Sequence, residues 1–263
     1  MKQAVIVRGL GKHYRRYHQD RPWTLQEVFQ RGFRGLKPAE YFWALRQINF
    51  AVAPGRMVGV IGRNGAGKST LLRLLGSVGR PDEGRVTVHG RINALLDLGA
   101  GFHPDLTGRE NVFISGVING LTRREVSKEF DSIVAFSELE DFIDSPLRTY
   151  STGMQMRLAF AVATHTNPEV LLIDEVLGVG DLAFQRKCLE RIAQFKADGC
   201  TIILVTHDNG FVAKLCDEAL WLHAGRLMAH GPADEVASRY IAGAESPQDA
   251  QGKWSAVTES LGS

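Results

Sequence analysis

The stretch "GVIGRNGAGKST" (residues 59–70) decides the fold of this chain. It carries the G-x-x-x-x-G-K-S spacing of a phosphate-binding (Walker A) loop, between an apolar segment at 57–61 and the helical pattern "KSTLLRLLG". This strand–loop–helix context favours a nucleotide site, because glycines let backbone N–H groups converge on a phosphate at a helix N-terminus. The alternative, a glycine-rich turn without a ligand, is disfavoured by the same flanking segments.

The side chains and backbone of this loop suit ATP and its magnesium ion. Lys68 adds a point charge at the β- and γ-phosphates, and Ser69 offers a hydroxyl oxygen to Mg²⁺. The helix that follows adds the positive end of its dipole. The candidate nucleotide contacts are therefore Gly62, Asn64, Gly65, Ala66, Gly67, Lys68, Ser69 and Thr70.

Apolar segments alternate with helical patterns over most of the chain. Strands are predicted at 4–7, 57–62, 85–90, 170–174, 201–206 and 218–223. Helical patterns follow Gly67, Thr122, Gly153, Leu182 and Asn209. Several strands are apolar on both faces, as strands covered by helices on both sides must be. The alternation predicts an α/β fold with a largely parallel sheet.

Residues 107 to 165 break this alternation with consecutive helices. Two of them open with capping boxes, Thr107 with Glu110 and Thr122 with Glu125. We interpret 105–165 as a helical subdomain inserted into a domain that spans 1–242. The last segment, 243–263, lacks a sustained period, and we expect it to be a flexible tail or a linker.

The composition is that of an ordinary soluble globular protein. Of 263 residues, 44% are hydrophobic and 23% are charged. The longest uncharged runs are too short and too polar to cross a bilayer, and the start of the sequence does not resemble a secretory leader. Cys188, Cys200 and Cys216 lack metal-ligand spacing and are expected to be buried thiols. We therefore expect a protein that stays in the cytosol.

Acidic and histidine side chains are expected at the ends of two buried strands. "VLLIDEVLG" (170–178) ends a strand that we expect to lie beside the strand feeding the phosphate loop. There Asp174 can hold the Mg²⁺ shell and Glu175 can position the attacking water. "TIILVTHDNG" (201–210) places His207 where an imidazole can contact the γ-phosphate. Solvated acids and a structural histidine are the ordinary alternatives.

Together these parts resemble the nucleotide-binding subunit of ATP-binding cassette (ABC) transporters, over about residues 1–235. The resemblance implies a P-loop ATPase with a RecA-like α/β core, an inserted helical signature subdomain and an N-terminal antiparallel β region. The family signature, LSGGQ, corresponds to "YSTGM" (150–154) here. The family pattern implies a homodimer in which Ser151 and the Gly153 backbone contact ATP held by the partner, with Asp181 at the dimer contact. For Ser151 alone, an ordinary helix N-cap is the alternative.

Two features depart from the family pattern. The signature has Tyr150 for Leu, Thr152 for Gly and Met154 for Gln, from which we expect function with altered hydrolysis. Ungapped counting places Leu98 at the usual position of the loop glutamine. Asp97 is the nearest acid and is a candidate for part of the metal or coupling role.

Longer strings such as "LLDLGAGFHPDLTGREN" and "YSTGMQMRLAFAVA" are similar to the polysaccharide-export branch of the family. Its members drive lipid-linked O-antigen, capsule or teichoic-acid chains across the inner membrane. The resemblance implies an ATPase at the cytoplasmic face of that membrane, bound to a separate permease and acting on a lipid-linked polysaccharide. The alternative is a soluble ABC-type ATPase of translation or DNA maintenance. No extended basic stripe predicts a nucleic-acid partner.

A segment at 15–45 separates the first strand from the phosphate loop. The family pattern implies that Tyr14, in "GKHY", stacks on adenine, and an ordinary packed aromatic is the alternative. Thr24 and Glu27 predict a capped, basic amphipathic helix, to which "AEYFWALR" (39–46) adds aromatic residues. This helix is expected either to meet the membrane subunit or to pack its apolar face on the core.

Overall fold

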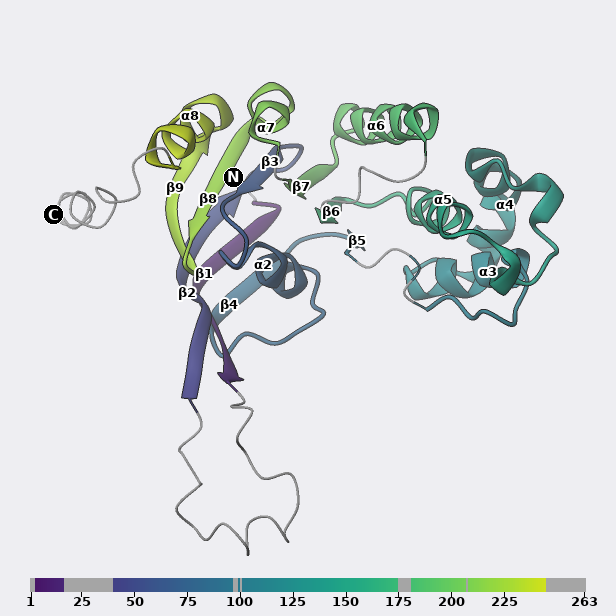
Figure 1. Cartoon of the computed structure of the whole chain (residues 1–263), viewed down its shortest axis with the longest axis horizontal. Coiled ribbons are helices and arrows are strands. Elements are labelled where there is room, and N and C mark those ends of the chain that lie inside the picture. The colour runs from purple at the N-terminus through teal and green to yellow at the C-terminus, as the bar shows by residue number, and fades with distance from the viewer. Residues whose placement is uncertain are drawn as a thin grey trace, which may run out of the picture.

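The computed structural model describes residues 3–16, 40–96, 99, 101–174, 181–206 and 208–244. These residues form two sheets and a separate group of helices (Figure 1). A six-stranded sheet has the order β5-β6-β7-β3-β8-β9, and a three-stranded sheet has the order β2-β1-β4. The predicted α/β fold is confirmed.

The six-stranded sheet is parallel except at β9, which pairs with β8 in antiparallel fashion. Its strands are β3 (Met57–Ile61), β5 (Ile92–Leu95), β6 (Val170–Asp174), β7 (Thr201–Val205), β8 (Glu218–His223) and β9 (Arg226–Pro232). One expectation about this sheet is wrong. The strand that ends in Asp174 does not lie beside β3, because β7 pairs with both strands and separates them.

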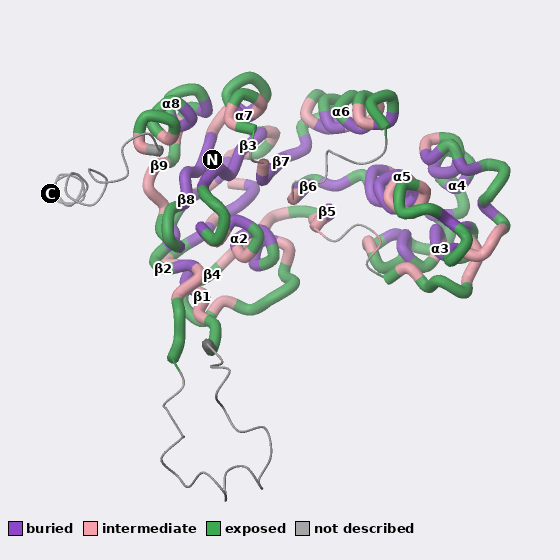
Figure 2. The backbone as a smooth tube through the Cα atoms, viewed as in Figure 1, coloured by how far each residue is buried: buried purple, intermediate pink, exposed green. Residues whose placement is uncertain are grey.

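Alternating side chains of the six-stranded sheet enter two different cores. Val58, Val60 and Leu172 point with their neighbours towards α2 (Lys68–Leu75) and the three-stranded sheet. Leu171 and Ile173 point the other way, towards helices on the opposite face. Those helices are α6 (Leu182–Ala197), α7 (Asn209–Leu215) and α8 (Ala233–Ala244) (Figures 1 and 2). This period of two explains why these strands are apolar on both faces.

The three-stranded sheet is antiparallel and consists of β1 (Val5–Arg16), β2 (Glu40–Val52) and β4 (Glu83–Val88). It corrects the expectation for 39–46. Glu40 to Arg46 lie in β2, where they extend a hairpin with β1 and do not belong to a helix. Trp43 faces His13 across the hairpin, with ring centroids 5.1 Å apart. The helix predicted around Thr24 lies outside the described residues.

The remaining helices form a group at one side of the molecule (Figure 1). They are α3 (Gly108–Ile118), α4 (Arg123–Ser137) and α5 (Thr152–Ala163), with short 3₁₀ turns η2 (Glu140–Phe142) and η3 (Leu147–Thr149). Both predicted capping boxes are present at Thr107 and Thr122. Among the described residues, no helix has the length and apolar character needed to span a bilayer.

The last helix extends slightly into the segment that was predicted to be a tail. Helix α8 includes 243–244, the first two residues of the predicted tail, and the rest of the tail lies outside the described residues. The three cysteines are free and buried, as expected. Burial raises the pKa of each thiol to about 12.

Candidate functional site

The phosphate loop connects β3 to α2 through three glycines with positive φ. Gly62 has φ 149° and Gly67 has φ 103°, and both are close to other backbone. A Cβ on Gly62 would overlap the carbonyl oxygen of Leu222, and one on Gly67 would lie 2.5 Å from that of Ala44. At Gly65, with φ 78°, a side chain would meet open space. The fold itself therefore requires two of the glycines, and the third leaves the tip of the loop open.

Helix α2 begins without a side-chain cap. Its N-cap, Gly67, is left-handed and makes no side-chain hydrogen bond to the first turn. Five other α-helices begin at side chains that accept such bonds, namely those of Thr107, Thr122, Ser151, Asp181 and Asp208. The first N–H groups of a helix need acceptors, and the dipole there favours an anion. The N-terminus of α2 thus has the properties of a phosphate site.

The side chains of the loop are arranged for the same purpose. Lys68 is only 7% exposed, and its Nζ donates to the carbonyls of Gly62 at 2.7 Å and Arg63 at 3.2 Å. These bonds hold the ammonium group over the loop. Ser69 is exposed and Thr70 is half-buried at the start of α2. A positive charge and two hydroxyl-bearing side chains therefore lie beside an uncapped helix end.

The other candidate residues follow strands that end at the same edge of the sheet as β3. Asp174 is the half-buried last residue of β6, opposite Val205 of β7. Asp97 comes two residues after β5, and His207 two residues after β7. Because β5, β6, β7 and β3 are parallel, their carboxyl ends meet at one edge, where α/β folds bind ligands. Asp97, Glu175 and His207 themselves lie outside the described residues.

The stretch at 150–154 starts helix α5. Ser151 is its N-cap, and its Oγ accepts a hydrogen bond from the N–H of Met154 at 3.2 Å. Gly153 has no positive φ, and a Cβ there would meet only Ser151 Oγ, at 3.8 Å. Glycine inside a helix costs about 0.5–1 kcal/mol relative to alanine. No contact among the described residues requires glycine at this position.

Tyr150, where the family pattern has leucine, anchors this helix start. The side chain is 5% exposed, and its hydroxyl donates to the carbonyl of Phe142 at 2.6 Å. Gly108, the first residue of α3, lies against that hydroxyl, where any larger residue would overlap it. Burial raises the pKa of Tyr150 above its ordinary value. The departure from leucine therefore adds a hydrogen bond from the signature to η2 and places the hydroxyl against the first residue of α3.

Asp181 is the N-cap of α6, and its Oδ1 accepts from the N–H of Phe184 at 2.9 Å. That hydrogen bond, with the charge of Arg157, holds the pKa of the carboxyl below its ordinary value. Oδ2 accepts from the guanidinium of Arg157 on α5. The segment just before Asp181 lies outside the described residues.

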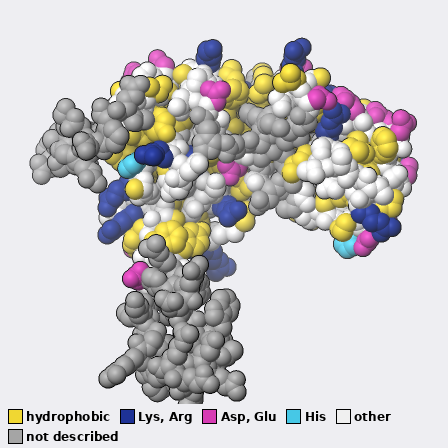
Figure 3. Space-filling model, in the orientation of Figure 1, with side chains coloured by type: hydrophobic (Ala, Val, Ile, Leu, Met, Phe, Trp, Pro, Cys, Tyr) yellow, Lys and Arg dark blue, Asp and Glu magenta, His cyan; other side chains and the backbone are white. Residues whose placement is uncertain are grey.

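Tyr14 lies near the end of β1 and is 41% exposed. Its ring packs across the hairpin against Phe42, with centroids 5.9 Å apart, and Lys12 Nζ lies 5.5 Å from its centroid. Figure 3 shows hydrophobic side chains gathered where β1 and β2 leave the body of the molecule. Tyr41 and Phe42 are 58% and 50% exposed there. An aromatic ring is therefore accessible on the hairpin.

A family model described as "ABC transporter" matches residues 45–178, from β2 through the phosphate loop and α5 to just beyond β6. The chain belongs to the ABC transporter family. It is a nucleotide-binding ATPase subunit of that family. The resemblance seen in its motifs is therefore confirmed.

Named relatives place this ABC subunit among exporters by similarity. It is 51% identical over 241 residues to the O-antigen export system ATP-binding protein RfbB of Myxococcus xanthus, covering 90% of this chain and 55% of that one. It is 43% identical over 242 residues to the RfbB protein of Klebsiella pneumoniae, covering 91% and 98%. The teichoic acids export ATP-binding protein TagH of Listeria monocytogenes is 42% identical over 199 residues, covering 76% and 59%. This chain thus spans little more than half of the first relative's length.

Solved structures share the ABC fold. The ATP-binding subunit of an ABC transporter matches with a TM-score of 0.71 at 23% identity, covering 90% of this chain and 93% of that one. A dimeric ATP-binding cassette bound to ADP and Pi matches with a TM-score of 0.68 at 22% identity, covering 87% and 98%. At this identity the likeness supports the fold alone.

Sequence reasoning missed two polar residues near the signature of this ABC subunit. Arg157 follows Ser151 by six residues, about 1.7 turns of α5, a spacing that matches no motif. Tyr150 was seen only as a departure from the consensus. Their partners, Phe142 and Asp181, lie 8 and 24 residues away in sequence, so no local pattern marks the contacts.

Proposed function

We propose that this chain is the ATP-hydrolysing motor subunit of an exporter for lipid-linked polysaccharide, working with a separate transmembrane subunit. The observation that carries the proposal is the 43% identity to a Klebsiella pneumoniae O-antigen export ATP-binding protein along 98% of that protein. Similarity to a teichoic acids exporter supports the same substrate class, an O-antigen-like, capsular or teichoic-type glycan.

The nucleotide of the proposed site is ATP, bound at the N-terminus of α2. Lys68 neutralises charge at its β- and γ-phosphates, and the N–H groups from Asn64 to Ser69 donate to them. The uncapped helix end, the open tip at Gly65 and the enclosed ammonium of Lys68 fit this role. Gly62 and Gly67 set the backbone path, Ala66 and Thr70 complete the loop, and Tyr14 stacks on adenine.

The residues for magnesium and hydrolysis come from the first turn of α2 and from the ends of the neighbouring strands. Ser69 and Asp174 are oxygen donors of the kind that Mg²⁺ prefers, with Asp97 as a further acid on β5's side. When bound, Mg²⁺ neutralises charge that develops between the phosphates. Glu175 positions the attacking water, and His207 contacts the γ-phosphate from the strand beside β3. Both roles are carried over from the family pattern.

The site is completed by a second copy of the chain. Ser151 and the Gly153 backbone at the start of α5 contact the γ-phosphate held by the partner, and Asp181 lies at the dimer contact. A glycine that the described fold does not require at 153 supports a close approach from outside the chain. ATP binding then closes the homodimer, and hydrolysis opens it.

Transport requires a membrane permease whose helices this subunit moves. Binding to that permease would hold the chain at the cytoplasmic face of the inner membrane. The test has two parts. In cells depleted of the protein, one long undecaprenyl-linked glycan should accumulate in the inner membrane. Unchanged lipid-linked glycans together with a translation or DNA-repair defect would overturn the proposal in favour of a soluble ATPase.

The second part uses the purified protein. The substitution Glu175→Gln should retain ATP binding, trap a closed dimer and reduce turnover by a factor on the order of 10² or more. Retained hydrolysis in that variant would remove Glu175 from the water-positioning role.

A further inference from the structure

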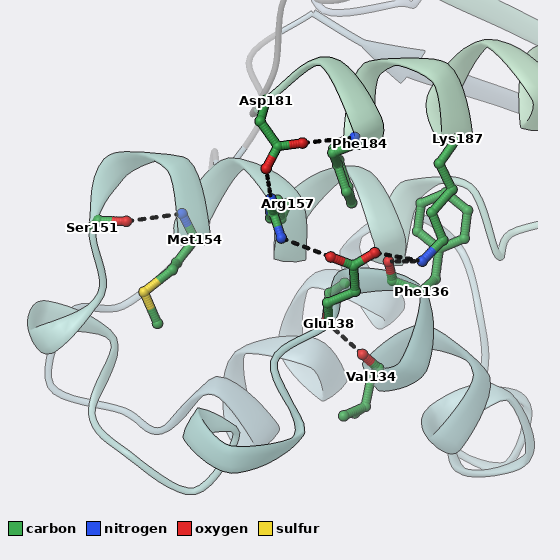
Figure 4. A network of polar contacts seen from close by, with 10 residues as sticks. Val134, Phe136, Glu138, Ser151, Met154, Arg157, Asp181, Phe184 and Lys187 are labelled. Atoms are coloured by element: carbon green, nitrogen blue, oxygen red, sulfur yellow. Dashed lines mark hydrogen bonds and ion pairs between the residues drawn. The ribbon is translucent and has the colours of Figure 1, made fainter.

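One arginine in the middle of helix α5 is joined to the N-terminal end of α6 (Figure 4). Arg157 lies on α5, six residues after Ser151. Its two terminal nitrogens reach different partners: one donates to Asp181 Oδ2 at 2.5 Å and the other to Glu138 Oε2 at 2.9 Å. The side chain of Arg157 is 20% exposed, whereas those of Asp181 and Glu138 are 61% and 51% exposed. The arginine therefore forms the enclosed centre of the cluster.

The orientation of the arginine is fixed from a third side. Its guanidinium carbon lies 4.9 Å from the ring centroid of Phe184, in the first turn of α6. A planar guanidinium that bridges two carboxylates and lies on an aromatic ring has little freedom to rotate. Lysine has one ammonium group and cannot reproduce all three contacts.

Glu138 links the same point to α4. It is the C-cap of α4 in a left-handed conformation, with φ 58°. Its second oxygen accepts from Lys187 of α6 at 3.1 Å, and Lys187 also donates to the carbonyl of Phe136 at 2.9 Å. The end of α4, the first part of α6 and the middle of α5 are thus held by one connected set of charges (Figure 4).

Asp181 uses both carboxylate oxygens within its own chain. Oδ1 caps α6 by accepting from Phe184, and Oδ2 accepts from Arg157. The position of this aspartate is therefore set relative to α5 as well as to its own helix. Helix α5 is the one whose N-terminus carries Ser151 and Gly153.

We propose that Arg157 is a positioning residue that sets the distance between Asp181 and the N-terminus of α5. The two groups that face the partner's nucleotide, the signature and Asp181, then approach it as one unit. This inference rests on the proposed function, because it assumes the ATP-dependent homodimer. Arg157 itself does not touch the nucleotide.

The cluster is poorly suited to a purely stabilising role. Ion pairs whose partners are more than half exposed contribute little to folding stability. Packing between these helices is already supplied by the rings of Phe136, Phe160 and Phe184, whose centroids lie 5.8–6.3 Å apart. The bridge therefore controls geometry more than it controls stability.

The test compares purified variants of the full chain. Arg157→Gln removes both ion pairs, and Arg157→Lys keeps a charge that can satisfy one of them. Arg109→Gln is the matched control, since Arg109 makes a bidentate pair with exposed Asp144 at 2.6 and 3.2 Å, away from α6. For each we would measure kcat and KM for ATP and the melting temperature. In the Glu175→Gln background we would also measure the ATP-dependent dimer fraction.

We expect Arg157→Gln to lower kcat about tenfold, with KM for ATP within about twofold of the original. The Glu175→Gln dimer fraction should fall, and the melting temperature should match that of Arg109→Gln. Arg157→Lys should recover part of kcat. Asparagine at 181 still caps α6, so Asp181→Asn removes only the ion pair with Arg157. The double variant with Arg157→Gln should therefore lose no more kcat than the more affected single variant loses.

Equal kcat in Arg157→Gln and Arg109→Gln would overturn the inference. The inference would also be overturned if the melting temperature of Arg157→Gln fell together with its kcat, and if Arg157→Lys lost as much of both. That result would assign Arg157 a purely structural role. Failure of the proposed function looks different. If the ATPase part of the proposal fails, the unmodified protein will not hydrolyse ATP and Glu175→Gln alone will form no dimer. If only the export part fails, lipid-linked glycans will stay unchanged while ATP hydrolysis and its dependence on Arg157 remain.

Discussion

The N–H of Gly225 donates a hydrogen bond to the carbonyl of Ala66 across 3.1 Å. Gly225 lies in the turn between β8 and β9, and its own carbonyl accepts from the N–H of Arg46 at 2.8 Å. One turn residue thereby connects the phosphate loop to β2 of the other sheet. The loop that holds phosphate and the hairpin that carries Tyr14 are consequently positioned by the same backbone contacts.

Substitution of Gly225 should weaken nucleotide binding. Gly225 has φ 76°, and a Cβ there would lie 2.8 Å from the carbonyl oxygen of Ala44. We expect Gly225→Ala to lower the free energy of unfolding by about 1–3 kcal/mol and to raise KM for ATP several-fold. Gly199→Ala is the control, because Gly199 has φ 84° but open space around it. Gly199→Ala should lose stability in chemical denaturation without a change in KM for ATP. Equal KM values in Gly225→Ala and Gly199→Ala would contradict the proposed connection.

Gly153→Ala should separate the needs of the fold from those of the site. The added methyl group has room, so the free energy of unfolding should stay constant or rise by up to about 1 kcal/mol. The melting temperature should therefore not fall. The ATPase rate should fall by a factor on the order of ten, since the methyl group meets the partner's nucleotide. ATP affinity of the separated monomer is the internal control. Full activity in Gly153→Ala would show that no partner approaches this backbone.

Removal of the Tyr14 ring should weaken ATP binding. Stacking on a base is worth about 1–3 kcal/mol, so Tyr14→Ala should raise KM for ATP at least about fivefold, whereas Tyr14→Phe should leave it unchanged. Tyr41→Ala is the control, because Tyr41 is also exposed on the same hairpin, at 58%, but its ring lies against His13. If Tyr14→Ala and Tyr41→Ala behave alike, Tyr14 is an ordinary packed aromatic.

His165 should make stability depend on pH below neutrality. Its Nδ1 lies 2.6 Å from the carbonyl of Ala161, which can only accept, so Nε2 accepts from the hydroxyl of Ser132 at 3.0 Å. Burial lowers the pKa of His165 below its usual 6.5, because the charged ring would lose solvation.

The unfolded chain therefore binds a proton that the folded chain excludes. Stability from this residue is complete above about pH 6.5 and is lost as pH falls towards the lower folded value. Urea denaturation at pH 7 and pH 5 should show a smaller loss in His165→Gln than in the unmodified protein. An identical loss in both proteins would place the titration elsewhere.

The three cysteines should be inert in the folded protein. With pKa values near 12, Cys188, Cys200 and Cys216 carry almost no thiolate at pH 8. We expect a thiol reagent such as DTNB to label them only as the chain unfolds, with all three reacting in denaturant. Rapid labelling of any cysteine in native buffer would contradict the buried placement.

Local patterns predicted the parts of the fold that local physics determines. The phosphate loop, both capping boxes and five helix starts depend on neighbouring residues, and the structure places the helix starts within two residues of the expected positions. The segment at 39–46 was assigned wrongly because three consecutive aromatics fit either period. Pairing with β1 decides it, and those partners lie about 30 residues away in sequence.

Non-local arrangement was the main source of the other differences. No pattern in 170–174 reveals that β7 separates it from β3, because strand order depends on crossover connections. Strands β5 and β9 and the final helix α8 were also missed; of these, only β5, with four residues, is too short for a clear pattern. At the candidate site, motifs located the phosphate loop and the signature, but Arg157 emerged only from its contacts across two helices.

The missing cap of α2 has a consequence for the lifetime of the protein. In the proposed site, a bound phosphate takes the role for α2 that the Thr107 side chain has for α3, so ligand occupancy would become part of the folding equilibrium. A ligand present at a hundred times its dissociation constant adds about 2.7 kcal/mol to the free energy of unfolding. The resistance of this subunit to proteases should therefore rise and fall with the ATP concentration around it, even when it is transporting nothing.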